Sequence, residues 1–376
     1  MTAAEQSGGF SPSKLSDVEK GLSALWGKPI PYGSKESGPP EVRVCTLSLV
    51  IYAPDDEAQS FALEAVHRAT SENPLRVICM RVEPAGPDVP PEGQVSGMCQ
   101  VTDTGNVVVC CEEIIVTAKG KAVNELAASV SNLLVSDLPI VLWWMGRPDF
   151  DLPLLNQLEL ISDYILVDSH EFSDTLDGFQ RMIDNLEGHP QVIPNDFNWL
   201  RTSAWRELTA ELFDDPVNLS KLHEITALDI AYSSAGISNP SQALLYAAWF
   251  AGRLNWYTAE KLSLSDSNEY SARMKTVDGK DIAITLKQVD RVEPSDGNLV
   301  SISIKTSVGD SFVLDYADCR INVEAIAGGK TTSGMCIPWC PKSLSINEML
   351  AKELSALWPD AVYVDTLKTC AKLIEG

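Results

Sequence analysis

Apolar positions in the first half of the chain follow two alternating patterns. Short, nearly continuous apolar runs are typical of strands that are buried on both faces, and apolar residues at every third or fourth position are typical of one helix face. After Glu41 these patterns predict strands over 42–52, 75–82, 95–101, 106–116, 138–145 and 164–168, and helices over 55–70, 122–135, 153–160 and 175–186. Such alternation predicts an α/β domain with a mostly parallel sheet.

Local signals support two of these helices. Asp55 and Asp56 precede an apolar stripe, so they suit the N-terminal cap and the positive end of the helix dipole. Pro153 suits a first helical turn because it has no amide proton to leave unpaired. A further helical spacing from Leu15 to Trp26, followed by a Pro- and Gly-rich run to Pro40, predicts an N-terminal helix and a linker over 1–40.

The pattern changes after Pro194. A helix is predicted over 197–213, and Asn239 with Pro240 begins a second helix to residue 255 that is apolar on nearly every side. The remaining elements are predicted strands over 271–287, 299–306 and 311–326 and a capped helix over 346–357. Asp278 and Gly279 are typical of a tight hairpin turn. We therefore predict an α/β domain over 41–194 and an α+β domain with antiparallel strands over 195–376.

Charge and composition exclude several classes of protein. The chain has 29 basic and 52 acidic residues and a net charge of −23, which opposes binding to nucleic acid or to an anionic membrane surface. No apolar run reaches the ~18 residues of a membrane span, and the first residues lack the basic and apolar segments of a secretory signal. With nine cysteines, an odd number, we expect free thiols and a cytoplasmic location.

Familiar catalytic motifs are missing from the sequence. There is no G-x-G-x-x-G turn for a dinucleotide and no G-x-S-x-G nucleophile turn. The Gly329-Lys330-Thr331 run lacks the first glycine of a phosphate loop, and adjacency alone cannot give Asp168, Ser169 and His170 the geometry of a triad. The four histidines have no metal-ligand spacing. We expect no catalytic residue, no metal and no cofactor.

Four cysteines near the C-terminus are candidates for redox chemistry. Cys336 and Cys340 lie four residues apart in a Pro-rich stretch that is predicted to be a loop, where a disulfide would not interrupt regular structure. Cys319 and Cys370 are alternative partners. The simpler interpretation is that all four are inert thiols, because spacing defines neither a distance nor a thiol pKa.

Tryptophans mark the strand over 138–145. Trp143 and Trp144 end this strand and face opposite sides of the sheet, and Arg147 follows them. Core packing is the favoured role for both rings, although Trp and Arg at a strand end also suit an interface anchor.

Three long segments together resemble one protein family. They are 133–146 (LLVSDLPIVLWWMG), 196–214 (DFNWLRTSAWRELTAELFD) and 239–256 (NPSQALLYAAWFAGRLNW), and they are similar to the OpcA family, the assembly proteins of glucose-6-phosphate dehydrogenase. Residues 47–57 (LSLVIYAPDDE) and the Cys110-Cys111-Glu112 run resemble its cyanobacterial members.

The resemblance implies a non-catalytic allosteric activator. Members of the family bind glucose-6-phosphate dehydrogenase, promote its active oligomer and so raise NADPH supply through the oxidative pentose phosphate pathway. On this basis the candidate partner-binding residues are Trp143, Trp144, Arg147, Trp199 and Trp205. Photosynthetic cells need this pathway in darkness, when thiols are oxidised, so the resemblance also points to redox control through the C-terminal cysteines, with thioredoxin as a second candidate partner.

An enzyme is the alternative interpretation. An α/β protein that acts on, or senses, a phosphorylated sugar would place its site at the carboxyl ends of the strands. Arg147 and Asp168 follow two such predicted strands. Stabilisation of the protein by sugar phosphates or nicotinamide nucleotides would favour this alternative.

Overall fold

The computed structural model describes residues 5–14, 17–25, 41–43, 45–69, 74–101, 108–234, 239–265, 269–291, 293, 297–327, 330–340 and 345–376. The chain forms two compact units that interleave along the sequence. Unit 1 comprises Met1–Val167, Gly188–Asn195 and Ile346–Pro359, and unit 2 comprises Asp168–Glu187, Asp196–Ser345 and Asp360–Gly376. Within unit 1, the phenol of Tyr164 donates a hydrogen bond of 2.7 Å to the Leu357 carbonyl, so the late segment is tied to a much earlier strand.

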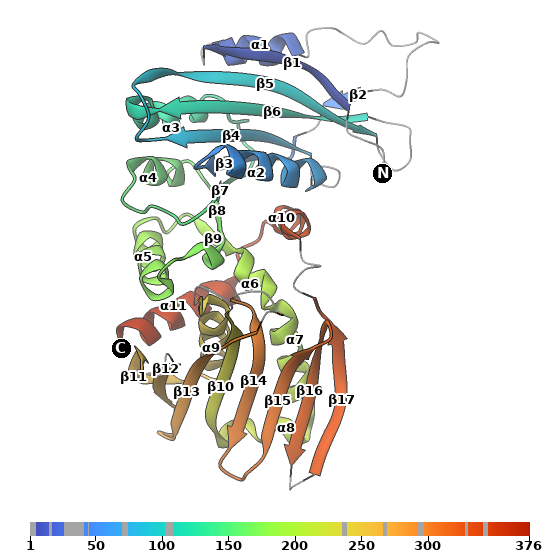
Figure 1. Ribbon diagram of the computed structural model, residues 1–376, viewed down its shortest axis with the longest axis vertical. Coiled ribbons are helices and arrows are strands. Elements are labelled where there is room, and N and C mark those ends of the chain that lie inside the picture. The colour runs from blue at the N-terminus through green and yellow to red at the C-terminus, as the bar shows by residue number, and fades with distance from the viewer. Residues whose placement is uncertain are drawn as a thin grey trace. The chain divides into compact units, whose positions relative to one another are not determined.

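Unit 1 is built on a nine-stranded mixed sheet with helices beside it (Figure 1). Its strands are β1 (Glu5–Lys14), β2 (Glu41–Arg43), β3 (Leu47–Ala53), β4 (Leu75–Glu83), β5 (Val89–Val101), β6 (Val108–Lys119), β7 (Ile140–Trp144), β8 (Tyr164–Val167) and β9 (Ile193–Asp196). Its helices are α1 (Val18–Leu25), α2 (Asp56–Ala69), η2 (Gly120–Glu125), α3 (Leu126–Ser131), α4 (Pro153–Glu159) and α10 (Ile346–Ser355).

The strand order of this sheet is doubly wound. The order is β1-β5-β6-β4-β3-β7-β8-β9, and β2 pairs with β6. Strands β6, β4, β3, β7 and β8 are parallel, whereas β1 and β5 pair antiparallel at the edge. Every residue of β3 is buried, as its continuous apolar run predicts. Because β3 lies between β4 and β7, the chain order reverses there, which makes β3 and β7 the switch point of the sheet.

Unit 2 contains an eight-stranded sheet in the order β11-β12-β13-β10-β14-β15-β16-β17. Its strands are β10 (Ile225–Ser233), β11 (Tyr257–Leu264), β12 (Glu269–Lys275), β13 (Asp281–Val289), β14 (Leu299–Thr306), β15 (Ser311–Ala317), β16 (Arg320–Ala327) and β17 (Lys330–Pro338). Its helices are η3 (Ser169–Glu171), α5 (Thr175–Gly188), α6 (Phe197–Arg201), α7 (Ser203–Asp214), α8 (Pro216–Leu219), η4 (Leu222–Glu224), α9 (Ser241–Arg253) and α11 (Ala361–Glu375).

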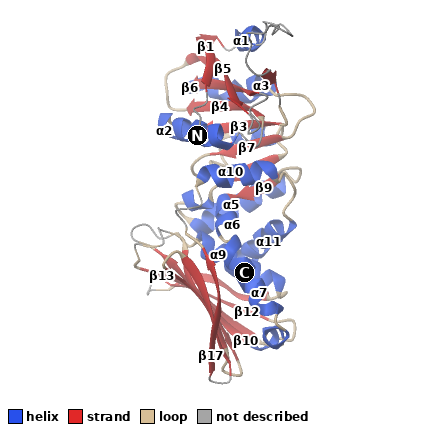
Figure 2. Ribbon diagram, turned by 90° about the vertical axis from the view of Figure 1, so that its right-hand side faces the viewer, coloured by secondary structure: helices blue, strands red, loops and turns tan. Residues whose placement is uncertain are grey.

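Helices cover one face of the unit 2 sheet, as Figure 2 shows for α7, α9 and α11. Only β10 and β13 pair parallel, and the other neighbouring strands are antiparallel. Residues 241–251 of α9 are all buried, in agreement with a helix that is apolar on nearly every side. The predicted fold class is therefore confirmed: an α/β unit with a mostly parallel sheet and an α+β unit with antiparallel strands.

Local signals predicted several element boundaries correctly. The side chain of Asp55 accepts a hydrogen bond of 2.8 Å from the Ala58 amide at the start of α2, and Pro153 lies in the first turn of α4. Gly279 has a φ of +82° in the turn between β12 and β13, as a tight hairpin requires. The predicted linker before Pro40 lies outside the described residues.

Other predicted elements are divided or different. The strand expected over 311–326 is a hairpin, because Asp318 and Cys319 both adopt positive φ values, 53° and 55°, and reverse the chain. The helix expected over 197–213 is interrupted at Thr202, and the loop expected around Cys336 is strand β17. Strands β1, β10 and β11 and helix α11 were not predicted. Strand β1 pairs with β5 and β10 pairs with β13 and β14, all far away in sequence. Strand β11 is mostly exposed, so it lacks the apolar pattern of a buried strand.

Candidate functional site

The switch point of unit 1 is filled by two aromatic rings. Tyr52 of β3 and Trp144 of β7 are register partners. Their ring centroids lie 3.7 Å apart with an interplanar angle of 5°, and the side chains are 9% and 1% exposed. Burial, together with the charge of Asp149, raises the pKa of the Tyr52 phenol. This is the place where doubly wound sheets usually bind nucleotides, and here the protein packs its own rings.

Carboxylates occupy the helix terminus beside that switch point. A helix N-terminus attracts phosphate because its first amides are unpaired and its dipole is positive. At the start of α2, Asp55 already accepts the Ala58 amide, and Asp56 accepts a hydrogen bond of 2.8 Å from Nε of Arg81. The first turn also contains Glu57. These residues do not fit a dinucleotide, because a pyrophosphate there would meet three negative charges.

Arg147 is the exposed member of the predicted tryptophan–arginine group. It follows Gly146, which has a φ of +75° and no atom within 4 Å of the position a Cβ would take. Trp143, on the other face of β7 from Trp144, is 2% exposed. Both rings therefore have the burial of core residues, and Arg147 presents its charge at the surface of unit 1.

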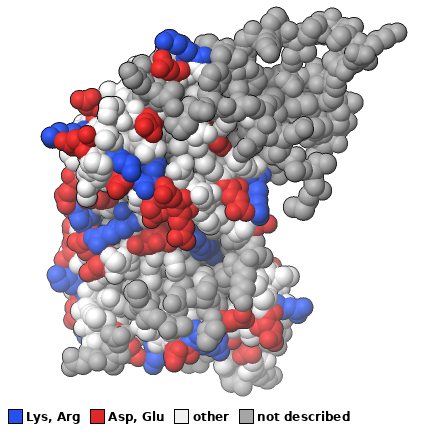
Figure 3. Space-filling model, turned by 45° about the horizontal axis from the view of Figure 1, so that its top comes forward, with Lys and Arg blue, Asp and Glu red and all other residues white. Residues whose placement is uncertain are grey.

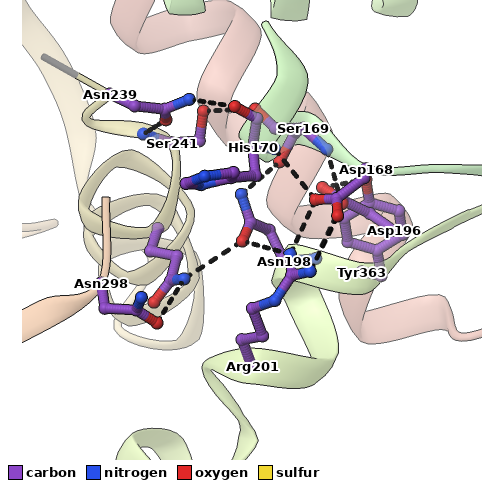
Figure 4. A network of polar contacts seen from close by, with 11 residues as sticks. Asp168, Ser169, His170, Asp196, Asn198, Arg201, Asn239, Ser241, Asn298 and Tyr363 are labelled. Carbon is purple, nitrogen blue, oxygen red and sulfur yellow. Dashed lines mark hydrogen bonds and ion pairs between the residues drawn. The ribbon is translucent and has the colours of Figure 1, made fainter. Parts of the chain in front are cut away.

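A polar network in unit 2 begins at the carboxyl end of β8 (Figure 4). Arg201 donates from its two terminal nitrogens to the two oxygens of Asp168, each at 2.7 Å, which is a bidentate ion pair. Oδ1 of Asp168 also accepts the His170 amide at 3.1 Å. Burial lowers the pKa of Arg201, but its hydrogen bonds to Asp168 and the surrounding negative charges raise it on balance. Asp168 is therefore a paired carboxylate.

Asp196 is the buried carboxyl of this network and is 1% exposed. Its Oδ1 accepts the amides of Ser169 and Asn198 at 3.0 and 2.8 Å, and the phenol of Tyr363 donates to its Oδ2 at 3.3 Å. Burial, and then the charge of Asp168, raises the pKa of Asp196 to about 6. Asp196 thus caps helix α6 and joins it to η3 and α11.

Amide side chains extend the network to α9 and β14. Gln242 donates to the side-chain oxygens of Asn198 and Asn298, both at 3.1 Å. Asn198 in turn donates to the hydroxyl of Ser169 at 3.1 Å, and Ser241 donates to the Ser169 carbonyl at 2.8 Å. The hydroxyl of Ser169 is fully buried between the Asn198 amide and the Asp196 carboxyl, and its hydrogen bond to that carboxyl partly offsets the rise in the pKa of Asp196. The geometry is that of a structural network with satisfied polar groups.

Trp199 and Trp205 lie in the core of unit 2, with 5% and 0% exposure. The indole nitrogen of Trp199 donates to Asp360 at 2.7 Å, and the guanidinium carbon of Arg206 lies 3.3 Å from the Trp199 ring centroid, a cation–π contact. Trp205 meets Trp339 edge to face at 5.7 Å. Direct contact of these rings with a partner stays a prediction, and packing is the role that their positions support.

The structure brings Cys340 to Cys319 rather than to the predicted leading partner, Cys336. The two sulfurs lie 2.7 Å apart, and the Trp339 amide donates to the Cys319 carbonyl at 2.9 Å. Cys336 is exposed on β17 opposite Asn322. Cys370 is fully buried in α11, and burial raises the pKa of its thiol. The pair Cys319–Cys340 was an open alternative, and the turn at Asp318 is what places it.

In the described parts of the chain, no cluster of three or more His, Cys, Asp or Glu side chains has the arrangement of a metal site. No helix there is long and apolar enough to cross a membrane.

Asn198, Gln242 and Asn298 were missed by the sequence analysis. Isolated amides in a helix or at a strand start carry no spacing signal, and only the tertiary structure brings them together. The signal that was present is Asp196, which directly precedes the first residue of α6, because Asp is a typical N-cap.

Fold and site together define a two-unit protein in which an α/β unit with a filled switch point is joined to an α+β unit with a buried polar network. The family profile described as glucose-6-phosphate dehydrogenase subunit N-terminal domain matches residues 66–184, and the one described as the C-terminal domain of that subunit matches residues 194–367. The chain belongs to this family, the OpcA family.

Curated relatives agree with this membership. The chain is 28% identical to a putative OxPP cycle protein OpcA of Synechococcus elongatus over 310 residues, 80% of this chain and 68% of that protein. It is 33% identical to the protein of that name in Nostoc punctiforme over 185 residues, 49% of this chain and 38% of that protein. The chain thus spans well under half of the Nostoc relative.

Solved structures with a similar backbone arrangement include two oxidoreductases. An NAD binding oxidoreductase from Klebsiella pneumoniae covers 88% of this chain and 95% of its own, with 9% identity and a TM-score of 0.48. KijD10, a 3-ketoreductase from Actinomadura kijaniata, covers 88% of this chain and 96% of its own, with 12% identity and a TM-score of 0.47. Superpositions this loose carry no inference about chemistry.

Proposed function

We propose that this protein is a non-catalytic allosteric activator and assembly factor that binds glucose-6-phosphate dehydrogenase in the cytoplasm. In this proposal it promotes the active oligomer of the enzyme and so controls the oxidative pentose phosphate pathway and NADPH supply. The family match over 66–184 and 194–367 carries the proposal. The rings of Tyr52 and Trp144 at the switch point, and the carboxylates beside them, support a protein that does not itself bind a dinucleotide.

An activator of this kind acts by differential binding. It must bind the competent oligomer more tightly than the less active form, and a tenfold shift in that equilibrium requires about 1.4 kcal/mol. One interface of roughly 1,200–2,000 Å² is large enough to supply this difference.

The test combines the purified chain with the dehydrogenase of the same organism. We expect a complex in size-exclusion chromatography with light scattering, and a lower KM for glucose 6-phosphate or a larger tetramer fraction. The chain alone should turn over no substrate. Absence of both a complex and a kinetic effect, under reducing and oxidising conditions, would contradict the proposal. A large thermal stabilisation of the chain alone by sugar phosphates or nicotinamide nucleotides would favour the alternative, an enzyme or sensor for a phosphorylated sugar.

We further propose that the activation is redox-controlled through Cys319 and Cys340. The two thiols would pass two electrons and two protons to a disulfide of another protein, which becomes a dithiol, and reduced thioredoxin would reverse the exchange. The sulfur distance of 2.7 Å supports this pair over Cys336 and Cys340. By the chain-entropy model, closing a loop of this length stabilises the folded protein by about 3 kcal/mol.

Serine variants separate the two candidate pairs. We expect Cys319→Ser and Cys340→Ser each to abolish the redox response of activation, whereas Cys336→Ser leaves it unchanged. Cys370→Ser is expected to have no effect on that response because its thiol is buried. Loss of the response in Cys336→Ser, with a normal response in Cys319→Ser, would restore the pair favoured by sequence spacing.

A further inference from the structure

The unit 2 sheet has one face that no helix of the described residues covers. The helices α7, α9 and α11 lie on the other side (Figure 2). Burial alternates along each strand accordingly: Ile302 and Ile304 of β14 are buried, whereas Ser301 and Ser303 are partly exposed and Lys305 is exposed. The same alternation runs through β12, β13, β15 and β16. We call the uncovered side, formed by the outward residues of β10 and β12–β16, the open face.

Most outward side chains at the centre of the open face are small, and the Asp229–Lys305 ion pair lies among them. The outward residues of the two central strands include Ala227 and Ala231 of β10 and Ser301 and Ser303 of β14. Small side chains let a second sheet approach to the ~10 Å at which sheets pack face to face. With six strands of seven to nine residues, the face measures roughly 25 by 29 Å, or about 700 Å², near the ~800 Å² that each partner contributes to a standard interface.

The open face is also neutral, although the chain carries a net charge of −23. Its outward charged residues are five bases and five acids: Arg273, Lys275, Lys287, Lys305, Arg320, Asp229, Glu269, Asp281, Asp315 and Glu324. A second copy of the chain can therefore approach this face without the repulsion that the rest of the molecule would produce.

The order of charges across the face is self-complementary. The registers join Lys287, Ala231, Ser301 and Asp315 in one row across β13, β10, β14 and β15. A twofold axis along the strands, between β10 and β14, exchanges the two ends of this row. Lys287 of one copy then faces Asp315 of the other, twice in the dimer, and the small residues face one another at the centre. Twofold dimers require this kind of self-complementary patch.

The other rows agree with the same axis. The registers join Arg273 to Ile326 in one row and Ser271 to Glu324 in another. Across the axis, Arg273 of one copy faces Ile326 of the other, and Ser271 faces Glu324. No like charges meet in these rows. A hollow of about 390 Å³, lined in part by Ser271 and Arg273, lies on this side of the face. Across the axis, the hollow would receive the side chains of Glu324 and Ile326.

We infer that the open face of the unit 2 sheet binds the open face of a second copy, forming a twofold dimer with Lys287 opposite Asp315. The inference concerns the chain alone and does not rest on the proposed function. Within one chain these two residues are three strands apart, about 14 Å, which exceeds the screening length of about 8 Å at physiological salt. Coupling between them therefore has to come from a second copy.

Charge exchange is the test. We expect the wild-type chain to sediment as a dimer, and Lys287→Glu and Asp315→Lys each to raise the dimer dissociation constant at least tenfold. The double variant should restore dimerisation, because it again places opposite charges across the axis. Lys368→Glu on α11 is the matched control, since its ammonium is exposed on a helix and pairs with Asp365. It should leave the dimer unchanged.

Sedimentation velocity at chain concentrations of about 1–100 µM measures dissociation constants in the micromolar range. Thermal melting of each variant checks its fold. Lys287→Glu and the double variant both lose the Lys287–Glu269 ion pair of 2.9 Å, so recovery of the dimer in the double variant cannot be due to that pair. A monomeric wild-type chain at 100 µM would overturn the inference, as would a double variant that stays monomeric. A monomeric chain whose complex with the dehydrogenase is lost in both single variants would assign the open face to the enzyme instead.

Discussion

Arg201 holds both oxygens of Asp168 in a planar fork, with two hydrogen bonds of 2.7 Å between side chains that are less than one-fifth exposed. The pair joins α6 to the segment that follows β8. Its geometry matters because only a guanidinium presents two parallel donors to a carboxylate. A lysine at this position would keep the charge and lose one hydrogen bond.

We therefore expect Arg201→Ala to lower the free energy of unfolding by about 2–3 kcal/mol, since it leaves a partly buried carboxylate without its partner. Arg201→Lys should lose about half as much. Denaturant unfolding followed by circular dichroism measures both. Arg68→Ala, which removes an exposed ion pair with Glu64 on α2, is the control and should change stability by less than about 1 kcal/mol. Equal effects at the two arginines would contradict the structural role of the network.

Asp196 predicts a specific dependence of stability on pH. Its folded pKa of about 6 lies above the ordinary value of 3.8, so the folded state binds its proton more tightly than the unfolded state. Stability from this group is therefore highest below pH 3.8 and is lost as pH rises through 6. The wild type should gain about 1.4 kcal/mol of stability relative to Asp196→Asn between pH 7.5 and pH 5, which is roughly half of the full effect of this shift in pKa.

The comparison with Asp196→Asn isolates this group because other titrating groups cancel in the difference. Tyr363→Phe, which removes the phenol that donates to Oδ2 of Asp196, should retain the same dependence. A difference between wild type and Asp196→Asn that is constant from pH 5 to 7.5 would show that the carboxyl does not titrate in this range.

The stacked pair at the switch point predicts a large effect of ring removal. Trp144→Ala should lower the free energy of unfolding by about 3–5 kcal/mol, because it leaves a cavity against Tyr52 in a buried position. Tyr52→Phe keeps the ring and should change stability by less than about 1 kcal/mol. Unfolding in urea measures both, and a small effect of Trp144→Ala would mean that the ring is not part of the core.

Arg147 predicts an effect on association without an effect on the fold. If the surface of unit 1 contacts the dehydrogenase through this cation, Arg147→Glu should weaken the complex at least tenfold and leave the melting temperature unchanged. Titration with the dehydrogenase by isothermal calorimetry measures the affinity.

Arg68→Glu is a matched charge reversal on the same unit (acidic and basic side chains lie close together over the face in Figure 3). We expect it to leave the affinity unchanged. Equal weakening by both variants would indicate a general electrostatic effect instead of a contact at Arg147.

The sequence by itself determined the fold class, the helix cap at Asp55, the first helical turn at Pro153 and the hairpin turn at Gly279. These features depend on local physics: hydrophobic period, the capping of free amides and the φ values that glycine tolerates. The family resemblance also came from contiguous segments, and the profile matches over both units confirm it. Each of these signals lies within a few residues of the position it describes.

Tertiary structure alone decided the rest. Cys340 lies beside Cys319 because two positive φ values reverse the chain at Asp318 and Cys319, and spacing within the sequence had favoured Cys336. Asn198, Gln242 and Asn298 form one network only after α6, α9 and β14 pack together. Weak strands such as β10 and β17 form because neighbouring strands supply their hydrogen bonds. Contacts between distant segments depend on the packing of the whole chain, so no local pattern records them.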